Sequence, residues 1–166
     1  MTKTHIIILL DNSYSMYSYQ QKILQGLNNF IYNLKNNNAK NIFMTIILFT
    51  TKLKYICTGL NIADVDIINS EHLSLSGSTS LYDSIYNTIF EWKDKSLDEN
   101  IMYTISDGED NNSRHSKKDI EYLIDSLDKW TIFHCDTDIS NLNLKNVHSI
   151  EYKLDNIDDL FNQMSI

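Results

Sequence analysis

Five consecutive large apolar residues near the start of the chain, Ile6 to Leu10, leave it few folds to adopt. A half-buried strand alternates apolar and polar residues, whereas this run is apolar at every position. Such a run is typical of a strand that is buried on both faces, in the middle of a parallel sheet with helices on either side. The sequence therefore predicts a central strand over Thr4–Leu10.

Strand-like and helix-like apolar patterns alternate along the rest of the chain. Further strands are expected at Ile42–Thr50, Leu53–Cys57, Ile101–Ile105, Thr131–Cys135 and Val147–Tyr152. Helices are expected at Tyr17–Lys35, Leu81–Phe90, Ile120–Leu127 and Ile157–Met164. The stretch Gly59–Leu75 is expected to be irregular, and Trp130 is expected at the end of a helix. This order predicts an α/β fold, a three-layer doubly wound (Rossmann-like) sheet of about six strands, mostly parallel, with helices on both faces.

One strand is expected to run against the others. Leu53–Cys57 follows Ile42–Thr50 too closely for a crossover helix, so the two should pair antiparallel as a hairpin. Leu53–Cys57 then belongs at an edge of the sheet.

Composition narrows the classes of function. The chain has 166 residues, which predicts a single domain over 1–166. Its 14 basic and 22 acidic residues give a net charge of −8 without a basic cluster, so we expect no binding to nucleic acid or to anionic lipid. No apolar segment is long enough to span a membrane, and Met1–Thr4 leaves no room for a signal peptide. An intracellular (cytoplasmic) protein is expected, and the excess of Asn, Ile, Lys and Tyr suggests an AT-rich genome.

Three polar loops follow or precede buried segments in a way that predicts a site. Asp11, Ser13 and Ser15 come directly after the first strand. Alone, they have a second interpretation as caps of the next helix. In open α/β sheets, however, ligands bind outside the carboxyl ends of the strands, where the strand order reverses. The loops Ser76–Ser80 and Ser106–Ser113 are expected at that same edge.

Together the loops supply oxygen ligands and almost no other kind. The second loop offers Thr79 after Gly77, and the third offers Asp107 before Gly108, where glycine permits a close approach or a sharp turn. With Asp11 and the two serines, this makes five oxygen-bearing side chains of which two are charged. Hard oxygen donors suit Mg²⁺ or Mn²⁺ better than Zn²⁺ or Cu²⁺.

These residues resemble a known family. Asp11-Asn12-Ser13-Tyr14-Ser15, the Thr79 loop and Ser106-Asp107-Gly108 are similar to the three parts of the metal-ion-dependent adhesion site (MIDAS) of von Willebrand factor type A domains. The resemblance extends from Thr4 to about Met164 and is closest to single-domain bacterial, phage and viral members. It implies direct metal ligation by Ser13 and Ser15, and ligation by Thr79 directly or through water.

The resemblance also implies how a partner would bind. Asp11 and Asp107 would act mainly through water, and the remaining position on the metal would accept an Asp or Glu carboxylate of a partner protein. Tyr14 is a departure, because the family commonly has Gly between the two serines. We therefore place Tyr14 on a rim that contacts the partner or partly covers the metal. The other residues of this rim are Gly77, Ser78, Glu109 and Asp110.

The function implied is a non-enzymatic protein-interaction module. The alternative is a Mg²⁺-dependent phosphatase or phosphotransferase of the haloacid dehalogenase type, which also places an Asp after its first strand. Those enzymes have an acid/base Asp two residues later, where this chain has Ser13, which cannot do that work near neutral pH. A third possibility is a degenerate domain that works through a metal-independent surface.

Other polar residues are interpreted structurally. The five histidines lack the i, i+4 spacing of a helical zinc site, so each is interpreted as a core or surface residue. Cys57 and Cys135 are interpreted as buried reduced thiols. Ser113–Ser116 is expected to cap the helix that follows it.

Overall fold

The computed structural model describes residues 2–37, 39–95, 97–108, 110–134, 147–149 and 154–164. Its strands are β1 (Thr4–Asp11), β2 (Ile42–Phe49), β3 (Leu53–Asn61), β4 (Glu99–Ile105), β5 (Trp130–His134) and β6 (Val147–Ser149). Its helices are α1 (Gln20–Asn36), α2 (Leu81–Trp92), α3 (Lys117–Asp125) and α4 (Ile157–Gln163), with 3₁₀ helices η1 (Tyr14–Tyr19), η2 (Ile62–Asp64) and η3 (Leu154–Asn156).

The strands form one six-stranded sheet in the order β3-β2-β1-β4-β5-β6. All neighbours pair parallel except β2 and β3, which form the expected antiparallel hairpin with β3 at the edge. The chain leaves β1 for β2 on one side and returns to β4 on the other, so the strand order reverses at β1. The predicted α/β fold class is therefore confirmed, and the crevice that it implies lies at the carboxyl ends of β1 and β4.

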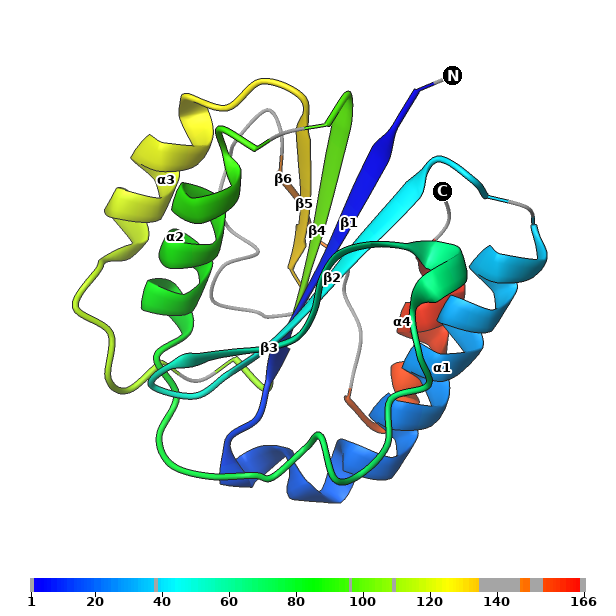
Figure 1. Ribbon diagram of the computed structural model, residues 1–166. Helices are drawn as coiled ribbons and strands as arrows, with labels where there is room; N and C mark the ends of the chain where they lie inside the picture. The colour runs from blue at the N-terminus through cyan, green and yellow to red at the C-terminus, as the bar shows by residue number, and fades with distance from the viewer. Residues whose placement is uncertain are drawn as a thin grey trace.

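Two layers of helices cover the sheet, α1 and α4 on one face and α2 and α3 on the other (Figure 1). Ile6, Ile8 and Leu10 face the first layer, whereas Ile7 and Leu9 face the second. All five are at most 1% exposed. At roughly 1.5–3 kcal/mol for each buried side chain, this run anchors both cores at once.

Helix α4 lies directly against α1 at a glycine. A Cβ atom placed on Gly26 would come within 2.2 Å of the Phe161 ring, so only glycine allows this close approach. The contact brings the end of the described chain back onto its first helix.

Several predicted boundaries are wrong. The chain forms the 3₁₀ helix η1 where the α-helix was expected to begin, and α1 starts only at Gln20. Strand β3 runs on to Asn61, into the stretch expected to be irregular. Trp130 begins β5 and does not end a helix.

Two further expectations concern single side chains. Ser116 does cap α3, through a capping box with Asp119. Cys57 is half-buried and free, and Cys135 lies outside the described residues.

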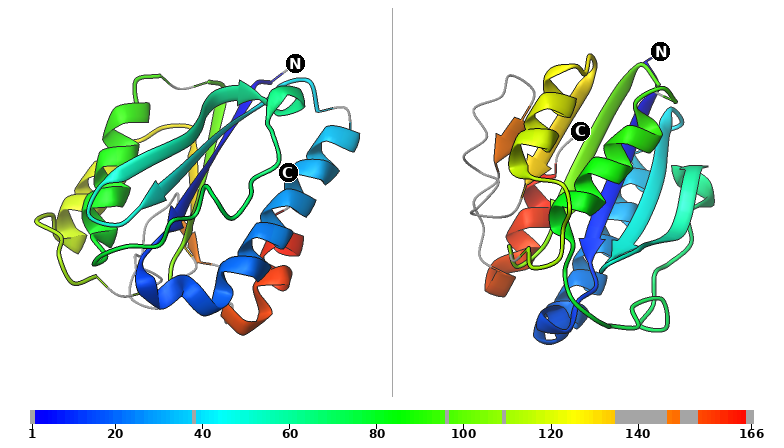
Figure 2. Two further views of the ribbon diagram at one scale, coloured as in Figure 1. Left: turned by 60° about the horizontal axis from the view of Figure 1, so that its bottom comes forward. Right: turned by 90° about the vertical axis from the view of Figure 1, so that its left-hand side faces the viewer.

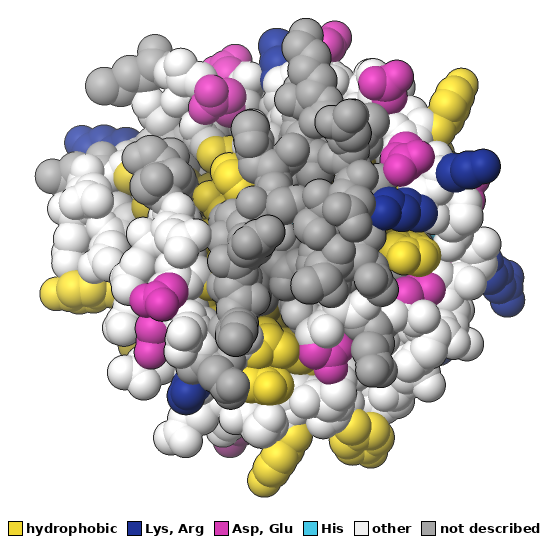
Figure 3. All heavy atoms as spheres, turned by 180° about the vertical axis from the view of Figure 1, so that it is seen from behind, with side chains coloured by type: hydrophobic (Ala, Val, Ile, Leu, Met, Phe, Trp, Pro, Cys, Tyr) yellow, Lys and Arg dark blue, Asp and Glu magenta, His cyan; other side chains and the backbone are white. Residues whose placement is uncertain are grey.

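No helix in the described part of the chain has the length and apolar character that a membrane crossing needs. Lysine and arginine side chains lie scattered among acidic ones on the back face (Figure 3).

Two buried histidines are held in the neutral form. The Gly59 N–H donates to Thr45 Oγ1 over 2.8 Å, and the same oxygen is hydrogen-bonded to His5 Nε2, also over 2.8 Å. Burial lowers the pKa of His5 to about 4 and that of His134 to about 3. Neither ring nitrogen of His134 has a hydrogen-bond partner among the residues described.

Acid should therefore destabilise the fold as the pH falls below the ordinary pKa of histidine. Both histidines bind a proton near pH 6.5 in the unfolded chain but not in the folded one. The free energy of unfolding should be highest above pH 6.5 and should fall as the pH drops, on the order of 3 kcal/mol for each histidine by pH 4. Urea denaturation from pH 7.5 to pH 4.5 measures this. His134→Leu should keep about half of the dependence, and an unfolding free energy that stays flat over this range would contradict two neutral buried histidines.

Candidate metal centre

The three polar loops meet at the carboxyl ends of β1 and β4, the edge brought forward in Figure 2, left. The first and second loops are joined by Ser76 N–H, which donates to the Asn12 carbonyl over 3.1 Å, and by Asn12 Nδ2, which donates to the Ser74 carbonyl over 3.0 Å. The first and third are joined by Ser106 Oγ, which donates to Asp11 Oδ2 over 2.7 Å. The predicted convergence of the loops is thus present in the fold.

Asp11 lies at the centre of this arrangement and is 2% exposed. Its Oδ1 accepts the Ser13 N–H over 2.8 Å, while its Oδ2 accepts the Ser106 hydroxyl. Burial raises the pKa of Asp11, and the nearby charge of Asp107 adds to the rise. A buried carboxylate with a second negative charge near it favours a cation at this place.

Ser13 and Ser15 present their hydroxyls to each other, with the two Oγ atoms 3.0 Å apart. Ser13 occupies the N-cap position of η1, but its side chain makes no capping hydrogen bond. The interpretation of these serines as helix caps is therefore wrong, because neither hydroxyl serves the helix that follows.

Thr79 is 3% exposed and is held through its backbone. Its N–H donates to Asn111 Oδ1, and its carbonyl accepts the Asn111 N–H, each over 3.1 Å. Asp107 is half-buried on the same loop as Asn111. Gly108 has a φ of 92°, which only glycine adopts without strain, and this turn follows directly after Asp107.

The predicted rim is open. Tyr14 is 68% exposed, and Tyr17, one turn later in η1, is 74% exposed. Gly77 and Ser78 are exposed as well. Asp110 is half-buried and accepts the Ser113 hydroxyl over 2.6 Å, so it is partly committed to its own loop. Glu109 lies outside the described residues.

Three residues hold the site together in roles that the sequence did not predict: Asn12, Ser106 and Asn111. Ser106 had a signal, because Leu10 pairs with Ile105 in the parallel register and places the next residues, Asp11 and Ser106, side by side. Asn12 and Asn111 gave none, since asparagine in a polar loop has many uses.

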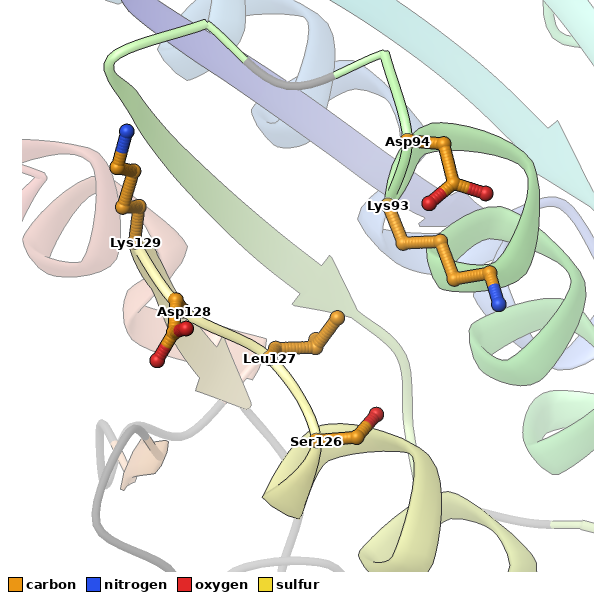
Figure 4. Close-up of a pocket in the computed structure, with 6 residues that line it drawn as sticks. All are labelled: Lys93, Asp94, Ser126, Leu127, Asp128 and Lys129. Atoms are coloured by element: carbon orange, nitrogen blue, oxygen red, sulfur yellow. The ribbon is translucent and has the colours of Figure 1, made fainter.

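Other places in the described part of the chain fit a metal less well. Across the described residues, the candidate site with its two carboxylates included, no group of three or more His, Cys, Asp and Glu side chains could hold an ion. A cleft of about 340 Å³ lies at the opposite end of the sheet, lined by Lys93, Asp94 and Ser126–Lys129 (Figure 4). Its two lysines and two aspartates balance in charge, so the cleft has no evident preference for a cation.

Ser106→Ala should destabilise the folded chain by about 1–3 kcal/mol, because it removes a hydrogen bond from a buried carboxylate. Chemical denaturation in a buffer with EDTA measures this. Ser84→Ala is the matched control: its equally buried hydroxyl donates to the Ser80 carbonyl, which also accepts the Ser84 N–H, so it should cost less than about 1 kcal/mol. Equal losses in the two variants would contradict a special role for the Asp11–Ser106 bond.

Solved structures share this architecture at low sequence identity. The ArnB paralog VWA2 from Sulfolobus acidocaldarius has a TM-score of 0.68 at 17% identity, over 99% of this chain and 46% of that protein. Proximal thread matrix protein 1 from the mussel byssus, in a structure with a zinc-occupied MIDAS motif, has a TM-score of 0.66 at 14% identity, over 98% and 47%. The PilB minor pilin from Streptococcus sanguinis has a TM-score of 0.73 at 12% identity, over 98% and 60%.

This chain spans about half to three fifths of the length of those proteins. No protein-family model matches the sequence, and no curated protein matches it. The identities are low enough that the likeness concerns the fold alone. The strand order, the two helical layers and these structural neighbours show that the chain has the fold of von Willebrand factor type A domains.

Proposed function

We propose that this chain is a non-enzymatic binding module that holds a divalent cation, Mg²⁺ or Mn²⁺, and through it the carboxylate of a partner protein. The observation that carries the proposal is the pair of Ser13 and Ser15 hydroxyls, 3.0 Å apart, beside buried Asp11 and unused as helix caps. Two hydroxyls that converge beside a buried carboxylate, without capping the helix that follows, fit ligands for an ion.

The spacing of the two hydroxyls fits the geometry of a hard cation. In an octahedron with metal–oxygen distances of about 2.0–2.1 Å, adjacent oxygens are about 2.9 Å apart. In a tetrahedral zinc site with similar bond lengths they are about 3.4 Å apart. The two serine oxygens lie near the octahedral value, so a metal ion would replace their mutual hydrogen bond without moving them far.

The charges fit as well. Asp11 and Asp107 together balance the charge of a divalent ion, and each oxygen of Asp11 accepts a hydrogen bond that holds the carboxylate in place. Asp11 would therefore orient the serines and metal-bound water, while Ser13, Ser15 and Thr79 supply neutral oxygens. A cation held by neutral ligands keeps most of its charge, which favours the carboxylate of a partner.

The donor atoms of this chain favour a metal other than the zinc that one structural neighbour contains. The mussel matrix protein holds zinc in its MIDAS motif. In this chain the proposed donors are hydroxyls and carboxylates, without sulfur or imidazole, which favours Mg²⁺ or Mn²⁺.

The arrangement of Asp11 argues against the phosphatase alternative. A nucleophilic carboxylate must present one oxygen to the phosphorus atom. Asp11 is 2% exposed, and each of its oxygens accepts a hydrogen bond. Its role as an orienting group is favoured over nucleophilic attack.

We propose that residues 1–166 form a single binding module of this kind and that it acts inside the cell.

Metal should stabilise the folded chain. At a concentration of Mn²⁺ or Mg²⁺ about 100 times the dissociation constant, binding adds about 2.7 kcal/mol and should raise the melting temperature by about 5–10 °C. Ser13→Ala should abolish most of this shift. Ser18→Ala, on the exposed side of the same 3₁₀ helix, should keep it. Calorimetry with and without millimolar metal measures the shifts, and a wild-type protein that shows none would count against the site.

Partner binding should depend on the metal and on Tyr14. A protein captured from a native lysate with Mg²⁺ should be lost in EDTA and with Asp11→Ala. Tyr14→Ala should weaken its capture while Mn²⁺ affinity, measured by calorimetry, stays unchanged. Tyr32→Ala is the matched control, since Tyr32 is 64% exposed on α1. Equal capture in Mg²⁺, in EDTA and with Asp11→Ala would rule out recognition through a metal.

A further inference from the structure

The loop Asp110–Ser113, between β4 and α3, contacts the start of α2 with four consecutive side chains. Asn111 bonds Thr79, and Asn112 Nδ2 donates to Ser80 Oγ over 3.4 Å. Asp110 accepts the Tyr82 N–H over 3.4 Å, and Ser113 Oγ accepts the Asp83 N–H over 3.0 Å. We call this set of contacts the clasp.

The clasp takes the place of an ordinary helix cap. The first N–H groups of a helix lack partners within the helix. Ser80, the N-cap residue of α2, makes no capping hydrogen bond with its side chain. Asp110 and Ser113 supply the missing acceptors from another part of the chain, so the position of the α2 start depends on the loop that follows β4.

Within the clasp, Asn111 acts on the residue proposed to bind the metal. It holds Thr79 from both sides, by its side-chain oxygen and by its own N–H, over 3.1 Å each. None of the hydrogen bonds that hold Thr79 in the described structure uses its hydroxyl. The two contacts therefore fix the backbone of Thr79 and leave Oγ1 for another ligand.

The clasp also connects Thr79 to the other proposed ligands. Asn111 lies four residues after Asp107, on the loop whose first residue, Ser106, bonds Asp11. The loop after β4 is thus tied to the first loop by Ser106 and to the Thr79 loop by Asn111. This loop therefore fixes the positions of the other two loops of the site relative to each other.

We propose that Asn111 is a positioning residue for the metal centre, holding Thr79 at the place where its hydroxyl completes the site formed by Ser13 and Ser15. This inference rests on the proposed function, because it concerns the affinity of that same site. Metal binding and formation of the hydrogen bonds of the clasp are then thermodynamically linked, so each favours the other.

The test compares Mn²⁺ affinity by calorimetry with the melting temperature of the metal-free protein. Asn111→Ala removes the acceptor for the Thr79 N–H and should weaken Mn²⁺ binding about fivefold, the usual effect of one lost hydrogen bond. Its metal-free melting temperature should fall by only about 2–4 °C, because a single hydrogen bond to the buried Thr79 backbone is lost. Asn111→Asp keeps the acceptor and should restore the affinity.

Asn112 supplies the matched controls, because it lies beside Asn111 but bonds Ser80 and not Thr79. Asn112→Ala should bind Mn²⁺ within about twofold of wild type, and Asn112→Asp measures what an added negative charge contributes by itself. Rescue by Asn111→Asp must exceed that contribution.

Two results would overturn the inference while leaving the proposed function intact. One is wild-type Mn²⁺ affinity in Asn111→Ala. The other is equal weakening in Asn111→Ala and Asn112→Ala, which would indicate a general loosening of the loop. A wild-type protein that binds no Mn²⁺ would overturn the proposed function itself, and this inference with it.

Discussion

The hydrogen bond between Asp11 and Ser106 is the contact on which the rest of the site depends. It joins the ends of β1 and β4, the two central strands between which the strand order reverses. Parallel pairing of Leu10 with Ile105 brings the next residues, Asp11 and Ser106, side by side. Because Asp11 is buried, its oxygens must be paired, and Ser106 and the Ser13 N–H supply those partners. The orientation of the first loop follows from this requirement.

A site built in this way divides its oxygens between a carboxylate that holds the loops together and hydroxyls that cap no helix. The carboxylate of Asp11 accepts hydrogen bonds from Ser13 N–H and Ser106, whereas the hydroxyls of Ser13 and Ser15 bond each other and the Ser13 side chain also interacts with Asp11. Thr79 is likewise held by its backbone, so its hydroxyl is not required for the fold. This division fits a binding module, in which neutral ligands leave the charge of a cation available to a partner. It fits nucleophilic catalysis poorly, since the carboxylate is buried and hydrogen-bonded to the neighbouring loops.

The sequence was sufficient for those features that depend on local pattern or strand register. The run from Ile6 to Leu10 predicted a strand buried on both faces, and the short break before Leu53 predicted an antiparallel edge strand. The three loops were expected at one edge because parallel strands end together. Ser116 was expected to cap α3, and it does so.

Features that depend on contacts between distant segments were not predictable in the same way. Asn111 carries no local pattern that points to Thr79, which lies 32 residues earlier. Trp130 follows a helix in the sequence, but it pairs with Asn100 of β4 and so belongs to the first position of β5. The stretch after Tyr14 forms a 3₁₀ helix before α1, a difference in hydrogen bonding that apolar spacing does not record. Only the structure shows how these segments meet.

The most direct test of the proposed metal centre is anomalous scattering from a crystal soaked in Mn²⁺. We predict one strong anomalous peak between Ser13 Oγ and Ser15 Oγ, about 2.2 Å from each, with Thr79 beside it and Asp11 at a distance bridged by water. A peak elsewhere on the molecule, or none at millimolar Mn²⁺ between the two serines, would contradict the account.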